Sequence, residues 1–123
     1  MSTVPSEVSE MMQNSIMKRF WVAFQFPIAA EDEMLKHMAD HLRYMDANEN
    51  EVFLSGPLLR EGRTVDEGMT VLKTEDESEA RAFMDAEPLI KAGVRRYELR
   101  VWRVQESSLT LTISGFHGTA TLG

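Results

Sequence analysis

Hydrophobic side chains recur at every second position in several short segments of the chain. Residues 20–26 place three phenylalanines and a valine on one face, and Pro27 ends the run. A period of two is typical of a strand with one buried face. The strands expected from this pattern span residues 20–26, 51–55, 68–73, 97–102 and 109–113.

Two longer segments carry hydrophobic residues at helical spacing instead. Residues 31–47 place methionines and leucines on one face of a helix, and its acidic first turn suits the helix dipole. Before the second helix, Asp76 and Glu79 have the spacing of a capping box. We expect this helix to end near Ala86, because Pro88 disfavours a helical conformation at the residue before it.

The order of these elements is strand–helix–strand–strand–helix–strand, followed by one more strand. It predicts an α+β fold of the ferredoxin-like βαββαβ type with an extra C-terminal strand, and with both helices on one face of an antiparallel sheet. The second face of that sheet also carries alternate apolar residues and therefore needs a partner. We expect a homodimer formed through this open face, and a higher oligomer is a further alternative.

The composition narrows the chemistry. The 123 residues include no cysteine, which excludes disulfides, thiolate nucleophiles and metal sites built on cysteine. With 20 acidic and 13 basic side chains the net charge is −7, which argues against a nucleic-acid partner. The chain has no apolar run of about 18 residues and no secretory signal pattern, so we expect a cytoplasmic protein with no membrane partner.

Charge is distributed unevenly along the chain. Residues 31–87 carry 16 acidic and 6 basic side chains, a balance of −10, whereas residues 91–103 carry five basic side chains and one acidic, a balance of +4. The basic segment coincides with the fourth predicted strand. It is either a solvated strand face or a positive patch that attracts a small anion.

His41 is the first candidate for chemistry, because an imidazole oriented by a carboxylate serves as a general acid or base near neutral pH. It lies at the edge of the methionine stripe of the first predicted helix. The alternative is a hydrogen-bonded histidine packed between helix and sheet. His37 and Glu33 extend the same row, but a third metal ligand at convincing spacing is missing, so no metal site is expected.

Glu87 is the second candidate, because it directly precedes Pro88 and the restricted backbone there fixes the direction of the carboxylate. A solvated acid at a helix end is the alternative, and Asp85 competes for the same role. Ser55 ends its strand without a nucleophile-elbow pattern, which argues against a serine hydrolase. Neither a phosphate-binding loop nor a GxGxxG fingerprint occurs, and we expect no cofactor.

Three segments of the chain form a set with a defined order and spacing. They are HLRYM (41–45) with GPL (56–58), then GMTVL (68–72), and finally FMDAEPLIKAGV (83–94) with VW (101–102). Together they resemble the YciI-like (YCII-related) family of dimeric α+β barrel proteins. The resemblance implies a barrel domain at residues 19–104, preceded by an N-terminal extension (1–18) and followed by a C-terminal strand and tail (105–123).

Members of this family are described as having a histidine and an aspartate that form an active-site pair, and enzymatic relatives act on chlorinated hydroquinone-type aromatics. Muconolactone isomerases have a similar fold. The resemblance implies that His41 is the histidine of the pair. Glu87 stands where the family usually has Asp before Pro, and its extra methylene displaces the carboxylate by about 1.5 Å.

The function expected is that of a small, cofactor-independent lyase or isomerase that transfers a proton on a small aromatic or lactone-like molecule. His41 would be the base or acid, Glu87 would orient it, and Tyr44, Ser55 or Arg60 would contact the substrate. Two alternatives stay open: a non-catalytic ligand-binding or accessory module, and a structural or regulatory interaction protein.

Overall fold

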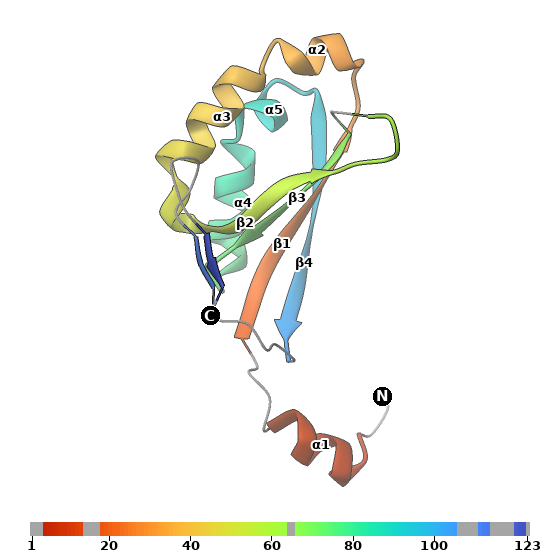
Figure 1. The fold of residues 1–123 in the computed structure, drawn as a ribbon, viewed down its shortest axis with the longest axis vertical. Helices are drawn as coiled ribbons and strands as arrows, with labels where there is room; N and C mark the ends of the chain where they lie inside the picture. Colours follow the sequence, from red (N-terminus) through yellow and green to blue (C-terminus); the bar gives the residue numbers. More distant parts are fainter. Residues whose placement is uncertain (1–3, 14–17, 64–65, 106–110, 114–119, 123) are drawn as a thin grey trace.

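A four-stranded antiparallel sheet organises the protein, as seen in a computed structural model that describes residues 4–13, 18–63, 66–105, 111–113 and 120–122 (Figure 1). Its strands are β1 (Lys18–Pro27), β2 (Val52–Leu58), β3 (Glu67–Leu72) and β4 (Arg95–Val104). They lie in the order β2-β3-β1-β4. This order, with the helical segments between β1 and β2 and between β3 and β4, confirms the ferredoxin-like α+β fold.

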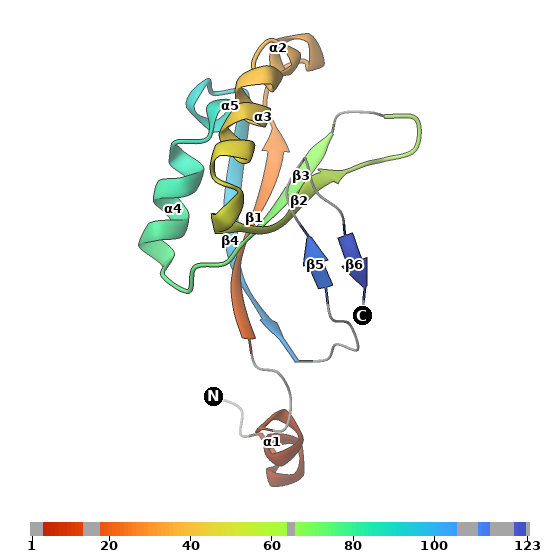
Figure 2. The ribbon, with the colours of Figure 1, turned by 60° about the vertical axis from the view of Figure 1, so that its left-hand side comes forward.

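The helices of the domain lie on one side of the sheet (Figure 2). They are α2 (Glu31–Leu35), α3 (Met38–Ala47), α4 (Glu77–Asp85) and α5 (Pro88–Lys91), and a 3₁₀ turn, η1 (Glu49–Glu51), leads from α3 into β2. The continuous helix expected over residues 31–47 is wrong, because the chain leaves helical geometry at His37. The break lets Met34 and Met45 enter two separate apolar clusters.

Helix α5 was not expected from the sequence, although its signal is visible there. Pro88 occupies its first turn, where a missing N–H is harmless, and Glu87 is its N-cap.

At the start of α4 one half of the predicted capping box forms, since the Asp76 side chain accepts hydrogen bonds from the N–H groups of Ser78 and Glu79. The other half does not form, because the N–H of Asp76 donates to the Thr74 hydroxyl and the Glu79 carboxylate accepts from that hydroxyl. Hydrogen bonds to the Asp76 carboxylate lower its pKa, first the bond from the Ser78 hydroxyl and then those from the backbone N–H groups of Glu79 and Ser78.

The side of the sheet that faces the helices, the helix-covered face, holds most of the core. One cluster there joins residues of β1 and β3 to α3 and α4; its buried members are Ala23, Met45, Leu72, Ala80, Phe83 and Met84. A second cluster, formed by Met34, Leu89 and Val94, lies under α2 and α5. The residues between the two clusters are polar, and they form the site described below.

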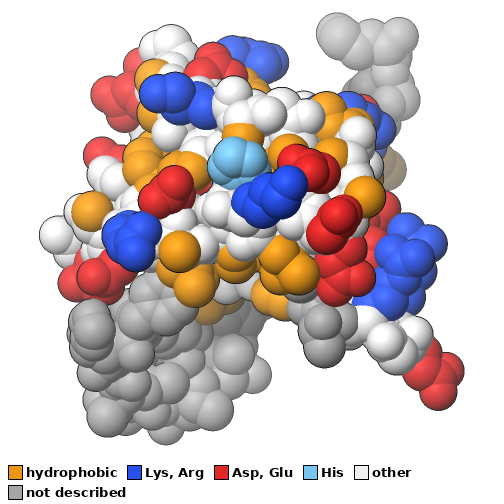
Figure 3. All heavy atoms as spheres, turned by 90° about the horizontal axis from the view of Figure 1, so that it is seen from above, with side chains coloured by type: hydrophobic (Ala, Val, Ile, Leu, Met, Phe, Trp, Pro, Cys, Tyr) orange, Lys and Arg blue, Asp and Glu red, His pale blue; other side chains and the backbone are white. Residues whose placement is uncertain are grey.

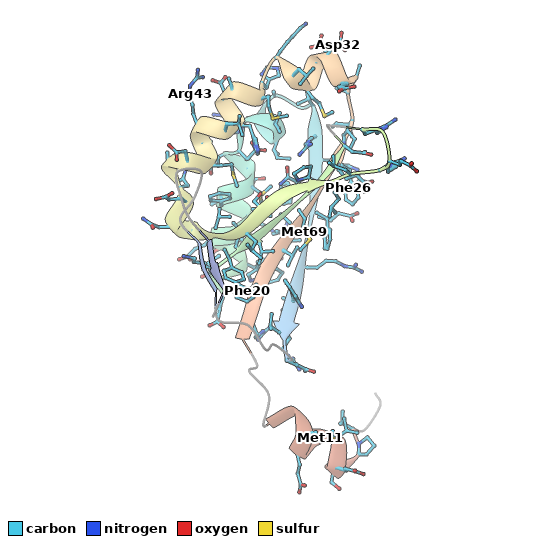
Figure 4. The ribbon with its side chains drawn as sticks, in the orientation of Figure 1. Met11, Phe20, Phe26, Asp32, Arg43 and Met69 are labelled. Atoms are coloured by element: carbon cyan, nitrogen blue, oxygen red, sulfur yellow. The ribbon has the colours of Figure 1, made fainter. Side chains whose placement is uncertain are left out.

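The opposite side, the second face, is also apolar. Phe20, Val22 and Val71 are buried there, and Phe20 stacks on Phe53 with ring centroids 4.9 Å apart. Figure 4 labels Phe20 and Met69, which belong to this face through the alternation along β1 and β3. The sequence pattern therefore predicted correctly that both sides of the sheet carry hydrophobic residues.

The ends of the chain add two small elements. The C-terminal run expected as one strand gives β5 (Leu111–Ile113), which pairs with β6 (Ala120–Leu122) in a separate two-stranded sheet. This hairpin lies on the side of the main sheet away from the helices (Figure 2). Helix α1 (Ser6–Gln13) occupies the expected N-terminal extension. His117 and residues 109–110 lie outside the described residues. Within the described part of the chain, no helix is long and apolar enough to cross a membrane.

Candidate active site

The two residues singled out from the sequence meet between α3 and the start of α5. The Nδ1 atom of His41 lies 2.6 Å from Oε1 of Glu87. The His41 side chain is 16% exposed and the Glu87 side chain 1% exposed. Arg43, two residues further along α3, points away from the sheet (Figure 4). One edge of the imidazole therefore stays close to the surface, while the carboxylate that holds it is shielded from water.

Backbone geometry fixes the Glu87 carboxylate. Because Pro88 follows, Glu87 is extended, with φ −68° and ψ 129°, between the end of α4 and the start of α5. Its Oε1 atom also accepts the N–H of Leu89 at 3.3 Å as the N-cap of α5. The competing carboxylate, Asp85, instead accepts the hydroxyl of Tyr97 on the exposed side.

This contact defines what the imidazole can do. A carboxylate beside Nδ1 favours the tautomer that carries its proton there, which leaves the lone pair on Nε2. No hydrogen bond to Nε2 is found within the described residues. An imidazole held in this way can accept a proton at Nε2, and the buried carboxylate then stabilises the imidazolium that forms.

A row of hydrogen-bonded polar side chains crosses the helix-covered face of the sheet near this pair. Arg95 on β4 donates from Nη1 to Oε1 of Gln25 on β1 at 3.1 Å, and Gln25 donates from Nε2 to the Thr70 hydroxyl on β3 at 2.7 Å. The Thr70 and Ser55 hydroxyls are 2.9 Å apart, which extends the row to β2. Sequence reasoning missed Gln25, Thr70 and Arg95.

The row separates the two apolar clusters of the helix-covered face. Along the chain, Gln25 lies between Ala23 of the first cluster and Ala29, which follows β1 and packs against the second. Gln25, Thr70 and Arg95 are 2%, 1% and 7% exposed. Burying polar groups here gains less stability than an apolar layer would, and the hydrogen bonds between them offset part of that cost. The sequence signal that could have found this row is Gln25, a polar residue at an inward position of an otherwise apolar strand.

The three residues predicted to contact the substrate, Tyr44, Ser55 and Arg60, lie in three different hydrogen-bonding environments. Tyr44 donates its hydroxyl to the carbonyl oxygen of Phe83 at 2.7 Å. Burial, and then the charges of Glu51 and Glu87, raise the pKa of Tyr44 to about 12, so it stays a neutral donor. Ser55 belongs to the polar row. Arg60 pairs instead with Asp66 in the β2–β3 connection, with 3.1 Å between Nε and Oδ2. Their role in binding stays a prediction.

The basic segment of β4 divides between the two faces of the sheet. Arg95 is buried on the helix-covered face, whereas Arg96 lies over the Phe26 ring at 4.4 Å and contacts Glu98 at 3.3 Å on the other. From above, Lys and Arg side chains intersperse with Asp and Glu, and a histidine is visible among them (Figure 3). Arg95 therefore does not belong to a solvated strand face.

A cavity of about 540 Å³ opens at the end of β1. It is lined by residues 27–31, by Met34 of α2 and by Arg63 of the β2–β3 connection, and neither member of the histidine–carboxylate pair lines it. Pro27 pairs with Arg95 in the register of β1 and β4, so the cavity adjoins the Arg95 end of the polar row. Among the described residues no group of three His, Cys, Asp or Glu side chains is arranged to hold a metal ion.

The comparison with known proteins agrees with this fold. The model of the YCII-related domain family matches residues 19–103. The chain belongs to the YCII-related domain family. No curated protein sequence matches the chain. A solved structure with the same fold is that of 5-chloro-2-hydroxyhydroquinone dehydrochlorinase from Burkholderia phenoliruptrix AC1100 in complex with 2,5-dihydroxybenzoquinone, with a TM-score of 0.60 and 18% sequence identity. The match covers 72% of this chain and 95% of that protein.

Proposed function

We propose that this YCII-related protein is a small enzyme that transfers a proton on a hydroxylated aromatic molecule, with His41 as the acid–base residue and Glu87 as the carboxylate that orients it. The observation that carries the proposal is the 2.6 Å contact between Nδ1 of His41 and the buried Oε1 of Glu87. A histidine–carboxylate pair with an unoccupied Nε2 is the usual arrangement of a general base.

The reaction class we propose is a lyase or isomerase step that uses no redox partner. In a chlorinated hydroxyhydroquinone, Nε2 of His41 would take the proton of a ring hydroxyl. The electrons of that O–H bond form a C=O bond, and the ring electrons bind a proton at the chlorine-bearing carbon, which becomes tetrahedral. A second ring hydroxyl then loses its proton, its O–H electrons form the second C=O bond, the ring electrons shift, and the C–Cl bond breaks with its electron pair leaving as chloride. The products are a hydroxyquinone and HCl, so the step balances without an oxidant.

Two further observations support this substrate class. The YCII-related match covers the part of the chain that holds both residues of the pair. The dehydrochlorinase that shares the fold acts on a chlorinated hydroxyhydroquinone and was solved with a dihydroxyquinone bound. The two-residue site described here needs no side chain from outside residues 19–103.

The test is a turnover assay under anaerobic conditions with 5-chloro-2-hydroxyhydroquinone and with a panel of small aromatic acids and lactones. We expect chloride release and hydroxyquinone absorbance well above the uncatalysed rate, with no metal or organic cofactor added. Thermal shift on the same panel measures binding separately. If the panel stabilises the protein but none of its members is converted, the result favours the ligand-binding module over the enzyme.

We also propose that the protein is a homodimer through the second face of the sheet. Trp102 and Leu54 lie on this face, next to buried Phe20 and Val71, and are still 42% and 38% exposed. We expect light scattering to give twice the chain mass for the wild type and the chain mass for Trp102→Glu. Leu59→Glu, at an exposed position of the β2–β3 connection, is the matched control and should stay dimeric. A wild-type protein of single-chain mass at micromolar concentration contradicts the proposal.

A further inference from the structure

Arg95 is a buried cation whose described partners are uncharged. Its side chain is 7% exposed. Nη1 donates to the amide oxygen of Gln25 at 3.1 Å, and Nη2 donates to the backbone carbonyl of Asp66 at 2.7 Å. Nε is buried and has no hydrogen-bond partner in the described part of the chain. No carboxylate there lies within ion-pair distance of the guanidinium.

The fold makes room for this guanidinium. A Cβ atom at Gly68 would lie 2.8 Å from Nη1 of Arg95, so any other residue at that position would displace the side chain. Burial lowers the pKa of Arg95, while the charges of Glu87 and then Asp66 act in the opposite direction. An arginine keeps its charge even so. A buried charge without a paired counter-charge is costly, which makes Arg95 a candidate to bind an anion.

Arg95 and the histidine–carboxylate pair belong to the same layer of the molecule. Glu87 is the N-cap of α5, and the chain passes from α5 through the turn at Gly93 into β4, where Arg95 is the first residue. The remaining carboxylate oxygen of Glu87, Oε2, is buried and unpaired, as is Nε of Arg95. The cavity at the end of β1 is lined by Pro27, the strand partner of Arg95.

We propose that Arg95 is the anion-binding residue of this site. Its Nε–H, which has no partner among the described residues, donates to the negatively charged oxygen of a phenolate or hydroxyquinone. This assignment rests on the proposed function for the identity of the ligand. Removing a proton from a ring hydroxyl creates an oxyanion, and a fixed guanidinium stabilises that charge where water is excluded. The amide oxygen of Gln25 and the backbone carbonyl of Asp66 hold the guanidinium in place as uncharged acceptors.

The experiment compares an anionic and a neutral ligand by isothermal titration calorimetry. The probes are 2,5-dihydroxybenzoquinone, which is an anion at neutral pH, and hydroquinone, which is neutral. We expect Arg95→Gln to weaken binding of the anion at least about tenfold, which is the size of a lost charge-assisted hydrogen bond. Hydroquinone affinity should change less than about threefold. Arg96→Gln removes the same charge from the next residue and the other face, and should alter neither affinity.

Specific results would overturn the assignment. They are a wild type that does not bind the anion, an Arg95→Gln protein that keeps full affinity for it, or an equal loss of affinity for both probes, which marks a purely structural role. If Arg95→Gln does not fold, the Nε–H resonance of Arg95 in the wild type is followed by NMR on addition of 2,5-dihydroxybenzoquinone. An unchanged resonance under saturating ligand also rejects the assignment.

The outcome is separable from that of the proposed function. His41→Ala should keep its affinity for 2,5-dihydroxybenzoquinone within about threefold, because the imidazole acts on a proton and the guanidinium on the charge. Anion binding that depends on Arg95 without any turnover rejects the enzyme and retains the binding residue. Turnover that survives Arg95→Gln with unchanged KM retains the enzyme and rejects Arg95 as the anion-binding residue.

Discussion

Replacing His41 with alanine is expected to lower kcat by about 10²- to 10⁴-fold, the range that a positioned general base contributes. Nε2 of His41 has no partner in the described structure, and its Nδ1 is held by Glu87 at 2.6 Å. The substitution therefore removes the proton acceptor and leaves the backbone of α3 intact. The measurement is steady-state turnover of the substrate that wild type converts best, together with circular dichroism to confirm that the variant is folded.

The matched control is His37→Ala. His37 lies at the junction of α2 and α3, four residues before His41, and its side chain makes no hydrogen bond among the described residues. We expect its turnover to stay within about twofold of wild type. Added imidazole should restore part of the activity of His41→Ala and have no effect on His37→Ala. Wild-type turnover in His41→Ala would remove the histidine from the mechanism.

The second large effect is expected at Glu87, where activity and stability should respond in different directions. Glu87→Gln keeps the size of the side chain and an oxygen that can cap α5, but it removes the charge that stabilises the imidazolium. An amide can also donate to Nδ1, which moves the imidazole proton to Nε2. We expect kcat to fall on the order of 10² to 10⁴, as for other histidines that lose their orienting carboxylate.

The free energy of unfolding should not fall in Glu87→Gln. Oε2 of Glu87 is buried with no hydrogen-bond partner in the described residues, so the charge itself carries a desolvation penalty. Urea denaturation is expected to give a midpoint equal to or above that of wild type. Glu87→Ala should lose activity and also stability, about 0.5–2 kcal/mol from the lost N-cap alone.

Glu87→Asp and Asp85→Asn complete the series. Shortening the side chain by one methylene withdraws the carboxylate by about 1.5 Å, which takes it out of hydrogen-bond reach of His41 unless α5 shifts. We expect Glu87→Asp to be impaired, and Asp85→Asn, on the exposed side beside Tyr97, to keep wild-type turnover. Full activity in Glu87→Gln would show that the carboxylate charge has no part in the reaction.

The hydrophobic pattern and residue types predicted His41 and Glu87 only as two separate candidates, and the family resemblance joined them as a pair. The residue types alone left Asp85 open beside Glu87, because both lie near the end of one helix, and the family resemblance selected Glu87. The structure separates them: Asp85 ends α4 on the exposed side, and the extended backbone at Glu87 turns its carboxylate toward α3. The extra methylene of Glu87 relative to Asp leaves Nδ1 of His41 and Oε1 of Glu87 2.6 Å apart.

The sequence by itself determined the elements of the domain, because each strand and helix is encoded by the period of its own hydrophobic residues. That period indicated a sheet with two apolar faces, the order βαββαβ, and His41 as a candidate base. It also misjudged residues 31–47, since the hydrophobic period is continuous across His37 although Met34 and Met45 pack into different clusters on either side of the break.

Only the tertiary structure decided which residues meet. His41 and Glu87 are 46 positions apart, and Arg95 reaches Gln25 across 70 positions. Contacts of this kind depend on strand register and on how α3 and α5 pack over the sheet, which no local period contains. Periodicity fixes whether a side chain points inward or outward. It does not show whether every polar atom of a buried side chain finds a hydrogen-bond partner, and in the described structure Nε of Arg95 and Oε2 of Glu87 find none.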